Sequence, residues 1–329
     1  MSSVAIVGAT GLVGSLFIEL LKSRKFPVSD LHLFASDKSV GQKVKFGKKN
    51  YSVKKLSPGC FAGVEFAFFS SGDSISAEWA PEAMKAGATV IDNSAAFRMH
   101  PNNKLIVPEI NGALLGSKRK AEIIANPNCS TIQLVMALKP LYDHFGISDV
   151  RVSTYQSVSG AGKAAFEELV SETKAVLAKK KFKTKEFVKP IAFNSIPQVG
   201  SIGDDGFCSE ENKIIKETKK ILDSDSFKIS AFTVRVPSMN GHAEAVWVTL
   251  KKSVARSDVL GCLERMPGVK VHTGLNEFPT VRFNSDDFVH VGRIHADREH
   301  ENTWMMWVVS DNLLKGAALN GIQIAEIFL

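Results

Sequence analysis

The chain has 329 residues, of which 44% are hydrophobic, and a formal net charge of +7 at neutral pH. This length and composition predict a globular protein with a substantial core and about two domains. The lysines are scattered, and the sequence has no helix-turn-helix spacing, zinc ligand pairs or aromatic-basic RNA-binding string, so we do not expect nucleic-acid binding. An acidic small-molecule substrate explains the positive charge equally well. We interpret the densest lysine run, residues 178–189, as a solvated helix end or loop.

The four cysteines are widely separated and form no CxxC pair. This usage indicates free thiols in a reducing compartment, with neither a disulfide framework nor a metal site. The N-terminus has no basic n-region, and glycines interrupt its apolar stretch, unlike a signal peptide. No run approaches the roughly 18 to 20 apolar residues of a membrane span. We therefore expect a cytoplasmic protein that does not associate with membranes.

The first half of the chain alternates strand-like and helical patterns. Residues 3–23 combine a short β-branched run, a glycine turn and apolar residues at helical spacing. Further strand-like runs are LHLFAS (31–36), VEFAFFSS (64–71) and ATVIDNS (88–94), and SAEWAPEAMKAG (76–87) is helical. Strands that alternate with helices predict a parallel sheet covered on both faces. We expect an α/β domain of the Rossmann type over residues 1–127.

The second half of the chain has a different pattern of apolar and polar residues. The segment at 130–146 has a helical pattern, and the segments at 150–160, 226–238 and 243–253 alternate like strands. A final helix is expected over residues 311–329. This pattern predicts an α+β domain with a mixed or antiparallel sheet over residues 128–310.

Three glycines directly follow the first predicted strand. Gly8, Gly11 and Gly14 form G-x-x-G-x-x-G, a variant of the dinucleotide fingerprint. Glycines let the backbone approach a pyrophosphate, which then lies at the positive end of the following helix. A plain tight turn is the alternative. We favour the cofactor interpretation because the pattern lies between a strand and a helix.

The end of the second predicted strand is expected to meet the adenosine ribose. An acidic residue there selects NAD, whereas a basic residue accepts the 2′-phosphate of NADP. The sequence offers Ser36, Asp37, Lys38 and Ser39. Lysine with two hydroxyls suits a phosphate, whereas an inward Asp37 would repel one, so the residues favour NADP. An ordinary polar loop explains the same residues equally well.

A polar segment, Asn126 to Thr131, separates two apolar runs and contains Cys129. The helical pattern begins directly after it, so the thiol lies at a helix N-terminus, where free amides and the helix dipole favour a thiolate and a developing oxyanion. A buried, inert thiol is an equally good interpretation from these residues alone.

A thiolate that attacks a carbonyl needs a proton carrier. His242 lies in a glycine turn between two predicted strands, seven residues after Arg235. A histidine there can titrate near neutral pH, although a surface turn is the default interpretation. The proximity of Cys129 and His242 is a prediction about the fold.

A series of motifs resembles the aspartate-semialdehyde dehydrogenase family. In chain order they are GATGLVG, SSGDS, VIDNSAAFRM, VPEIN, NPNCST, YQSVSGAG, PIAFNSIPQ, ENKIIKETKKIL, RVPSMNGHAE and SDNLLKGAALNGIQIAE, and they extend from residue 4 to the C-terminus. The related N-acetyl-glutamyl-phosphate reductases share the layout but typically have glycine before the cysteine and tyrosine after it. NPNCST departs from that pattern.

The resemblance implies an NADP-dependent reductive dephosphorylation of L-4-aspartyl phosphate to L-aspartate 4-semialdehyde, in the pathway to lysine, methionine and threonine. It implies that Cys129 forms a thioester, that His242 is the general acid/base and that Gln156 orients the acyl group. The implied substrate-binding residues are Arg235 for the α-carboxylate, Glu210 for the amino group, and Arg98, Asn128 and Lys213 for the phosphate. A dianionic phosphate and a carboxylate do need separate cationic anchors.

The resemblance also assigns cofactor contacts. Those residues are Gly8, Thr10, Gly11, Leu12 and Val13 in the glycine turn, Ser36, Lys38 and Ser39 after the second strand, Ser71, and Ser159, Gly160 and Asn312 near the nicotinamide. The last helix, 311–329, is expected to complete the first domain, and the second domain, 128–310, to build a homodimer or a dimer of dimers. Family members commonly carry arginine in place of Lys38, and lysine lacks the guanidinium plane, so the strength of the NADP preference stays open. The His-rich and acidic segment 290–302 has no functional interpretation.

Two alternatives stay open. A related acyl-phosphate reductase, such as an N-acetyl-glutamyl-phosphate reductase, would use the same nucleophile and cofactor site. A non-catalytic dinucleotide-binding paralogue would be expected to lack the nucleophile or the base, and both Cys129 and His242 are present.

Overall fold

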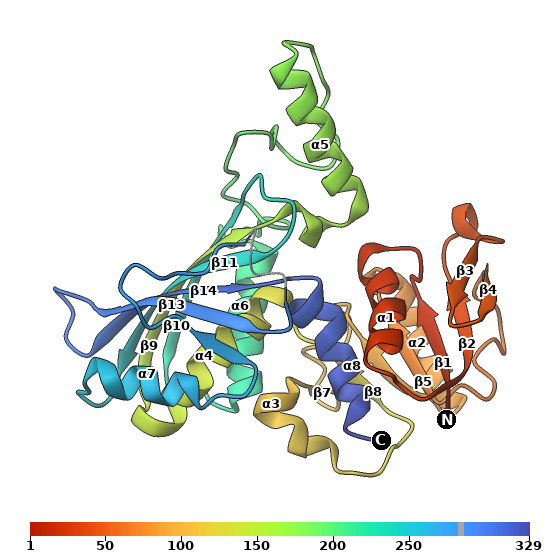
Figure 1. Ribbon diagram of the computed structural model, residues 1–329, viewed down its shortest axis with the longest axis horizontal. Helices are drawn as coiled ribbons and strands as arrows, with labels where there is room; N and C mark the ends of the chain where they lie inside the picture. Colours follow the sequence, from red (N-terminus) through yellow and green to blue (C-terminus); the bar gives the residue numbers. More distant parts are fainter. Residues whose placement is uncertain (282–285) are drawn as a thin grey trace. The chain divides into compact units, whose positions relative to one another are not determined.

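The computed structural model describes residues 1–281 and 286–329. The chain folds into two compact units (Figure 1). Unit 1 comprises Met1–Asn128 and Ala317–Leu329, and unit 2 comprises Cys129–Gly316. The chain therefore passes from one unit to the other at the peptide bond before Cys129. The C-terminal segment rejoins unit 1 from residue 317 rather than from residue 311.

Unit 1 contains an eight-stranded sheet with the order β3-β4-β2-β1-β5-β6-β8-β7. The strands are β1 (Ser2–Val7), β2 (Val28–Phe34), β3 (Lys43–Phe46), β4 (Lys49–Lys54), β5 (Phe66–Phe69), β6 (Thr89–Asp92), β7 (Lys104–Leu105) and β8 (Ile123–Ala125). The described ladders are parallel apart from the β3–β4 hairpin at one edge. The predicted parallel sheet is confirmed, with an added hairpin.

Helices cover both faces of this sheet. They are α1 (Leu12–Ser23), α2 (Asp73–Lys85), α3 (Pro108–Asn111) and α8 (Leu319–Glu326), with 3-10 turns η1 (Asp37–Ser39) and η2 (Gly112–Leu115). Neighbouring residues of β5 point to opposite faces. The ring of Phe68 lies 4.8 Å from that of Phe17 in α1, whereas Phe69 packs in the cluster that includes α2. On the α1 face, Arg24 Nε and Nη2 donate to the two carboxylate oxygens of Glu326 at 2.7 Å each, which ties the α1 end to α8.

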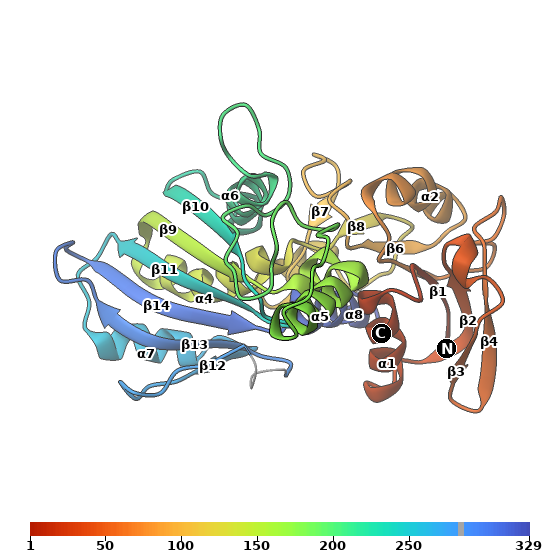
Figure 2. The same cartoon turned by 90° about the horizontal axis from the view of Figure 1, so that it is seen from above.

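Unit 2 contains a six-stranded mixed sheet with the order β10-β9-β11-β14-β13-β12 (Figure 2). The strands are β9 (Ile147–Gln156), β10 (Lys228–Arg235), β11 (His242–Leu250), β12 (Val269–Val271), β13 (Val289–Ala296) and β14 (Thr303–Ser310). The helices are α4 (Cys129–Phe145), α5 (Lys163–Leu177), α6 (Ser209–Leu222) and α7 (Arg256–Glu264), with a 3-10 turn η3 (Val158–Ala161) and a π-helical turn η4 (Leu314–Ala318) that ends in unit 1. The β9–β10 and β12–β13 ladders are parallel and the others described are antiparallel.

One face of this sheet is covered and the other is open. Along β9 the side chains of Val150, Val152 and Thr154 are buried, whereas Arg151 and Tyr155 are exposed. The period of two places the first set on one face, where α4 and α6 pack, and the second set on the other. Among the residues that the structure describes, this second face is partly exposed and lacks a covering layer of helices.

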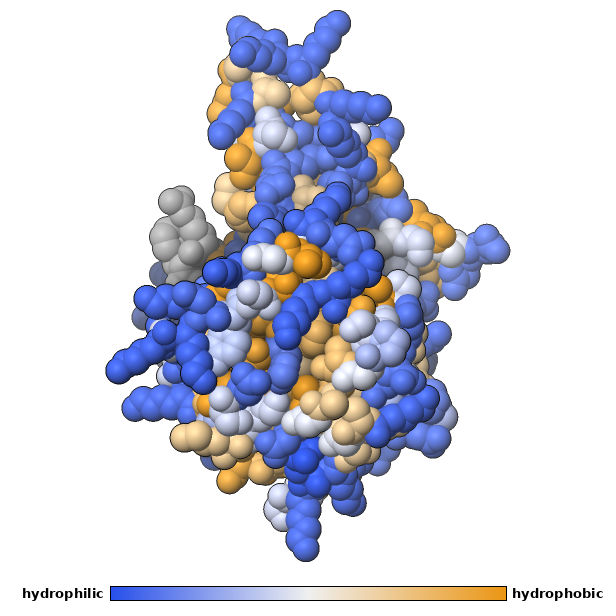
Figure 3. All heavy atoms as spheres, turned by 90° about the vertical axis from the view of Figure 1, so that its right-hand side faces the viewer, coloured by the Kyte–Doolittle hydropathy of each residue, from blue (hydrophilic) through white to orange (hydrophobic). Residues whose placement is uncertain are grey.

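The lysine-rich run 178–189 follows α5 as a largely exposed loop, as predicted. Two buried glutamates of α5 hold this chain segment by its backbone. Glu168 Oε2 accepts a hydrogen bond from the N–H of Lys185 at 2.8 Å, and Glu172 Oε2 accepts one from Ile191 at 2.8 Å. Figure 3, in which α5 is at the top, shows the hydrophilic side chains that gather there. The lysines therefore face solvent on an internally anchored loop.

The His-rich and acidic segment 290–302 comprises most of β13 and the tight turn that leads into β14. Asp297 Oδ1 accepts hydrogen bonds from the N–H groups of Glu299 at 2.9 Å and His300 at 3.1 Å, and these bonds lower the pKa of Asp297. His290 is buried and hydrogen-bonded inside unit 2. The unusual composition therefore has a local structural explanation.

None of the helices in the described ranges combines the length and the apolar character that crossing a membrane requires.

Candidate active site

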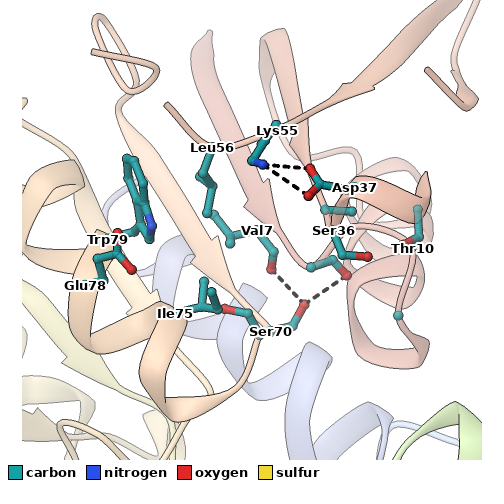
Figure 4. Close-up of a pocket in the computed structure, with 14 residues that line it drawn as sticks. Val7, Thr10, Ser36, Asp37, Lys55, Leu56, Ser70, Ile75, Glu78 and Trp79 are labelled. Carbon is teal, nitrogen blue, oxygen red and sulfur yellow. Dashed lines mark hydrogen bonds and ion pairs between the residues drawn. The ribbon is translucent and has the colours of Figure 1, made fainter. Parts of the chain in front are cut away.

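Unit 1 contains a pocket of about 540 Å³ (Figure 4). It lies at the carboxyl ends of β1 and of its two neighbours in the sheet, β2 and β5. Ligands usually bind at this position in an open parallel sheet. Its lining comes from the glycine turn (Val7, Gly8, Thr10 and Gly11), the end of β2 (Ala35, Ser36 and Asp37), the end of β4 (Lys55 and Leu56), the end of β5 (Ser70 and Ser71) and α2 (Ile75, Glu78 and Trp79).

The glycine turn at the floor of this pocket requires glycine. Gly8 has a φ of +87°, and a Cβ there would lie 2.7 Å from the carbonyl oxygen of Ser70. A Cβ on Gly14 would overlap the carbonyl oxygen of Gly8. Helix α1 begins at Leu12 with no acidic residue in its first turn, so its N–H groups and positive dipole end can receive an anion. These residues fit the pyrophosphate of a dinucleotide.

The structure brings most of the predicted cofactor residues of unit 1 to this pocket. Gly8, Thr10, Gly11, Ser36 and Ser71 line it, whereas Leu12 and Val13 lie in the first turn of α1 and Lys38 and Ser39 in η1. Ser39 Oγ is 3.1 Å from Thr10 Oγ1, which joins η1 to the glycine turn. The contacts of these residues with a cofactor remain predictions.

Two predicted substrate-binding residues, Arg98 and Asn128, belong to unit 1 and are buried. Arg98 Nε donates to the carbonyl oxygen of Asn126 at 2.9 Å, and its Nη2 donates to that of Asn93 at 2.7 Å. Asn320 of α8 donates to Asn126 Oδ1 at 2.7 Å. The chain that leads into Cys129 is therefore fixed by side chains from two distant parts of the sequence.

Three predicted residues of unit 2 lie in one row across the sheet. Gln156 ends β9, and the ladder registers pair it with Arg235 at the end of β10 and with His242 at the start of β11. All three side chains are buried. Strand register thus juxtaposes residues that are 79 and 86 positions apart, from 235 − 156 = 79 and 242 − 156 = 86.

The amide of Gln156 is held at both ends. Thr154 Oγ1 donates to Gln156 Oε1 at 3.0 Å, and Gln156 Nε2 donates to Glu210 Oε1 at 3.0 Å. Glu210 comes from the first turn of α6, and Lys213 Nζ lies 3.4 Å from its other carboxylate oxygen. The predicted residues Gln156, Glu210 and Lys213 therefore form one polar cluster.

His242 is buried beside this cluster. The N–H of Ser157 donates to His242 Nδ1 at 3.1 Å, which leaves the ring proton on Nε2 in the neutral imidazole. Burial, followed by the charge of Arg235, lowers the pKa of His242 to about 3. The imidazole is therefore neutral at physiological pH and presents an Nε2–H donor.

Arg235 lies within electrostatic reach of both His242 and Glu210. Its Nη1 donates to the carbonyl oxygen of Ser157 at 2.6 Å. Burial lowers the pKa of Arg235, and the nearby Glu210 and Cys129 oppose that effect. The guanidinium is a buried cation within electrostatic reach of Cys129.

Cys129 is not part of a disulfide, is partly exposed and is the first residue of α4. A Cβ on Gly316 would lie 3.0 Å from the Cβ of Cys129. A Cβ on Gly160 would lie 3.1 Å from His242 Nε2 and 3.2 Å from Arg235 Nη1. Two glycines therefore leave space beside the reactive groups, and the positive end of α4 favours a thiolate.

Two further predicted cofactor residues, Ser159 and Asn312, support the histidine turn within unit 2. Asn312 Oδ1 accepts hydrogen bonds from the N–H of Gly241 at 2.8 Å and from Ser157 Oγ at 3.1 Å. Asn312 Nδ2 donates to Ser159 Oγ at 3.0 Å. These bonds fix the turn that carries His242, and a role of either residue with the nicotinamide remains a prediction.

Sequence reasoning missed three features of the two sites. Lys55 and Trp79 line the pocket of unit 1 from elements whose positions depend on the tertiary fold. Gly316 packs against Cys129 across more than half the chain. Glu244, two residues after His242, is completely buried. The alternating pattern of β11 places Glu244 on the covered face, which was a readable signal of an unusual carboxyl group.

Two family models match the chain. The NAD binding domain of semialdehyde dehydrogenases matches residues 3–117, and the dimerisation domain of semialdehyde dehydrogenases matches residues 138–315. With a dinucleotide-type pocket in one unit and a cysteine, histidine and arginine cluster in the other, the fold and its sites define a semialdehyde dehydrogenase.

Relatives over the full length narrow this class. An Aquifex aeolicus protein named aspartate-semialdehyde dehydrogenase is 46% identical over 331 residues, which cover 99% of this chain and 97% of the relative. The chain belongs to the aspartate-semialdehyde dehydrogenase family.

Solved structures agree with this assignment. The crystal structure of aspartate semialdehyde dehydrogenase II from Vibrio cholerae, complexed with ASA, has a TM-score of 0.96 at 43% identity and covers 99% of this chain and 98% of that one. The structure of the Candida albicans enzyme with NADP has a TM-score of 0.76 at 26% identity, with 99% and 98% covered. The family resemblance and the fold class predicted from the sequence are confirmed.

Proposed function

We propose that the protein catalyses the NADP-dependent reductive dephosphorylation of L-4-aspartyl phosphate to L-aspartate 4-semialdehyde, through a thioester on Cys129. The observation that carries this proposal is the arrangement of Cys129, His242 and Arg235 in one compact unit of a member of this family. A nucleophile, a proton carrier and a carboxylate anchor are what the chemistry needs.

The first step is attack of the Cys129 sulfur on the acyl carbon. The C–S bond forms, the C–O bond to the phosphate breaks, and its electron pair leaves with the phosphate. The N–H groups at the start of α4 are suited to the developing oxyanion, and Gln156 is held rigidly enough to orient the acyl group. The products of this step are a thioester and inorganic phosphate.

The second step reduces this thioester. The hydride it requires would come from NADPH held in the pocket of unit 1. His242 acts through Nε2, because Nδ1 already accepts a hydrogen bond from Ser157, and its N–H stabilises the oxyanion of the thiohemiacetal on Cys129. The oxyanion reforms the carbonyl, the C–S bond breaks, and the sulfur leaves as a thiolate ready for the next turnover.

The polar residues around this centre suit the substrate. Arg235 has the planar guanidinium that binds a carboxylate in a bidentate fork, and Glu210 can receive the substrate ammonium. We assign the phosphate to Arg98, Asn128 and Lys213, as the family resemblance implies. Arg98 and Asn128 are buried, whereas Lys213 is partly exposed.

The pocket of unit 1 supports NADP as the cofactor. Its glycine turn fits a pyrophosphate, and hydroxyl and lysine side chains surround the end of β2. The related Candida albicans structure contains NADP. Ser159, Gly160 and Asn312 are assigned to the nicotinamide end on the family resemblance.

The open face of the six-stranded sheet supports a homodimer, alone or paired as a dimer of dimers. Tyr155, Phe232 and Phe278 are exposed aromatic residues, and the rings of Tyr155 and Trp307 lie 5.3 Å apart beside an apolar pocket of about 430 Å³. An exposed apolar surface of this kind marks an association site. Phe232→Asp should lower the molar mass measured by light scattering, whereas an unchanged dimer mass would contradict this surface.

The proposed reaction belongs to the aspartate-derived pathway to lysine, methionine and threonine, and we place the enzyme in the cytoplasm. The four cysteines form no disulfide, which suits a reducing compartment.

The decisive experiment is an assay in the oxidative direction. The purified protein is mixed with L-aspartate 4-semialdehyde, NADP and inorganic phosphate, and NADPH formation is recorded. We expect turnover that requires phosphate and exceeds the rate with N-acetyl-glutamate semialdehyde. Higher activity with the N-acetylated substrate would assign the chain to the related reductase activity instead.

A further inference from the structure

The cofactor pocket of unit 1 has an ion pair at its rim that the glycine turn does not require. Lys55 Nζ lies 2.9 Å from Asp37 Oδ1 and 3.1 Å from Asp37 Oδ2 (Figure 4). Asp37 follows β2 and begins η1, whereas Lys55 follows β4, the neighbouring strand. Both residues line the pocket, and Lys38, the lysine expected from the sequence, does not.

Asp37 occupies a position that governs the choice of dinucleotide. In Rossmann-type domains an acidic residue near the end of the second strand accepts hydrogen bonds from the ribose 2′-hydroxyl and selects NAD. The same carboxylate repels a 2′-phosphate, since the two charges have the same sign. Without a neighbouring cation, Asp37 would therefore make this pocket prefer NAD.

Lys55 reverses this electrostatic preference. Its ammonium contacts both oxygens of the carboxylate, so the negative charge at the rim is compensated. The side chains of Lys55 and Asp37 are 68% and 73% exposed, and exposed pairs of this kind contribute little to stability. A phosphate monoester carries up to about two negative charges, so it is a stronger partner for the ammonium than one carboxylate is.

We propose that Lys55 is the specificity-determining residue for the 2′-phosphate of NADP, and that its ion pair with Asp37 makes the pocket compatible with both dinucleotides while favouring NADP. With NADP bound, Lys55 contacts the phosphate and shields it from Asp37. With NAD bound, Asp37 accepts the ribose hydroxyl. The inference rests on the proposed NADP-dependent function and names the residue that determines its cofactor choice.

The test uses two fragments that differ only in the 2′-phosphate. Binding of 2′,5′-ADP and of 5′-ADP to the full-length protein is measured by isothermal titration calorimetry. Lys55→Met should weaken 2′,5′-ADP by roughly 10- to 100-fold, the range of a lost hydrogen bond to a charged group, and leave 5′-ADP unchanged. Asp37→Asn should strengthen 2′,5′-ADP and weaken 5′-ADP. The ratio of kcat/KM for NADP over NAD should fall in Lys55→Met and rise in Asp37→Asn.

The chain offers matched controls. Lys54 is exposed, adjacent in sequence and outside the pocket lining, so Lys54→Met removes the same charge and should change neither affinity. Lys38→Met tests the residue favoured by the sequence and should have the smaller effect. The proposal is overturned if Lys55→Met binds 2′,5′-ADP like the parent protein, if it weakens both fragments equally, or if Lys38→Met alone removes the preference.

The outcome separates this inference from the proposed function. If the parent protein uses NADP and Lys55→Met keeps the full preference, only the role of Lys55 fails. If the parent protein binds 5′-ADP more tightly than 2′,5′-ADP, both the assignment of Lys55 and the proposed NADP dependence fail.

Discussion

The two sites of this protein handle polar groups in opposite ways. The pocket of unit 1 uses backbone geometry at three glycines and an exposed ion pair, Asp37 with Lys55. The cluster of unit 2 buries His242 and Arg235 among hydrogen-bonded neighbours. Water screens the charges of the first site. In the second site the charged and polar groups lose their hydration, and their hydrogen bonds fix their orientation. Substitutions should therefore have large effects in unit 2 and small, selective ones at the rim of unit 1.

The largest effect on turnover is expected for the substitution of Cys129. Cys129→Ala removes the nucleophile, so turnover should fall at least roughly 10⁴-fold, as for other nucleophile deletions. Binding of NADP, measured by calorimetry, should stay nearly unchanged because the pocket belongs to unit 1. Cys60→Ala is the control, since Cys60 is also a partly exposed free thiol. Substantial turnover by a clean Cys129→Ala preparation would break the proposed mechanism.

The buried histidine predicts a loss of stability in acid. Between pH 6.5 and about 3 the unfolded chain binds a proton at His242 that the folded protein excludes, so stability rises with pH in this window. Acidification through it should cost at most roughly 3 to 5 kcal/mol in the free energy of unfolding. The measurement is urea unfolding at several pH values for the parent protein and His242→Gln. Equal pH slopes for the two proteins would contradict a buried neutral imidazole.

Gly160 tests the space beside the histidine. The added methyl group of Gly160→Ala meets His242 Nε2 and Arg235 Nη1, and displacement of these groups should lower kcat by roughly 100-fold. Gly261→Ala in α7 is the control, because its Cβ would make an ordinary contact. Parent-like kcat in both variants would show that turnover does not depend on the space beside His242.

A smaller effect is expected at Glu244. Burial raises the pKa of Glu244 well above 4.5, and Gln133 is its polar neighbour. Above pH 4.5 the unfolded chain releases a proton that the folded protein keeps, so stability falls as pH rises. Glu244→Gln should remove this loss and stabilise the protein by roughly 1 to 2 kcal/mol near neutral pH. The difference in the free energy of unfolding between variant and parent should widen from pH 5 to pH 7. A constant melting-temperature difference over that range would argue against a buried neutral acid.

The smallest effect is expected for the stability of the exposed pair. Lys55→Met should change the free energy of unfolding by less than about 1 kcal/mol, as is usual for exposed ion pairs. The check is the same urea titration, with Lys54→Met alongside. A loss as large as that expected for buried groups would mean that the pair is structural, and the contrast between the two sites would disappear.

Local patterns predicted local structure well. The strand, glycine turn and α1 follow from glycine spacing and helical periodicity within residues 3–23. The β3–β4 hairpin was not predicted, although its strands alternate polar and apolar residues, because both strands are short, rich in lysine and mostly exposed. The predicted helix from residue 311 begins at Leu314, with the π-helical turn η4 that continues into α8, and Gly316 of this turn packs against Cys129.

The sites depended on information that local patterns do not contain. Ladder register places Gln156 between Arg235 and His242, and no spacing in the sequence encodes that register. The family motifs identified these residues, but not the tautomer of His242, which the N–H of Ser157 determines. Lys55 was missed because the pairing of β2 with β4, not its neighbours in sequence, brings it to the pocket.

The central claim is a thioester on Cys129, and a single-turnover experiment tests it most directly. The protein is mixed with L-aspartate 4-semialdehyde and NADP in the absence of phosphate, then quenched in acid and mapped by peptide mass spectrometry. We expect a burst of NADPH that does not exceed one equivalent per site, together with an aspartyl adduct on Cys129. An NADPH burst without an adduct, or with the adduct on Cys60, Cys208 or Cys262, would contradict it.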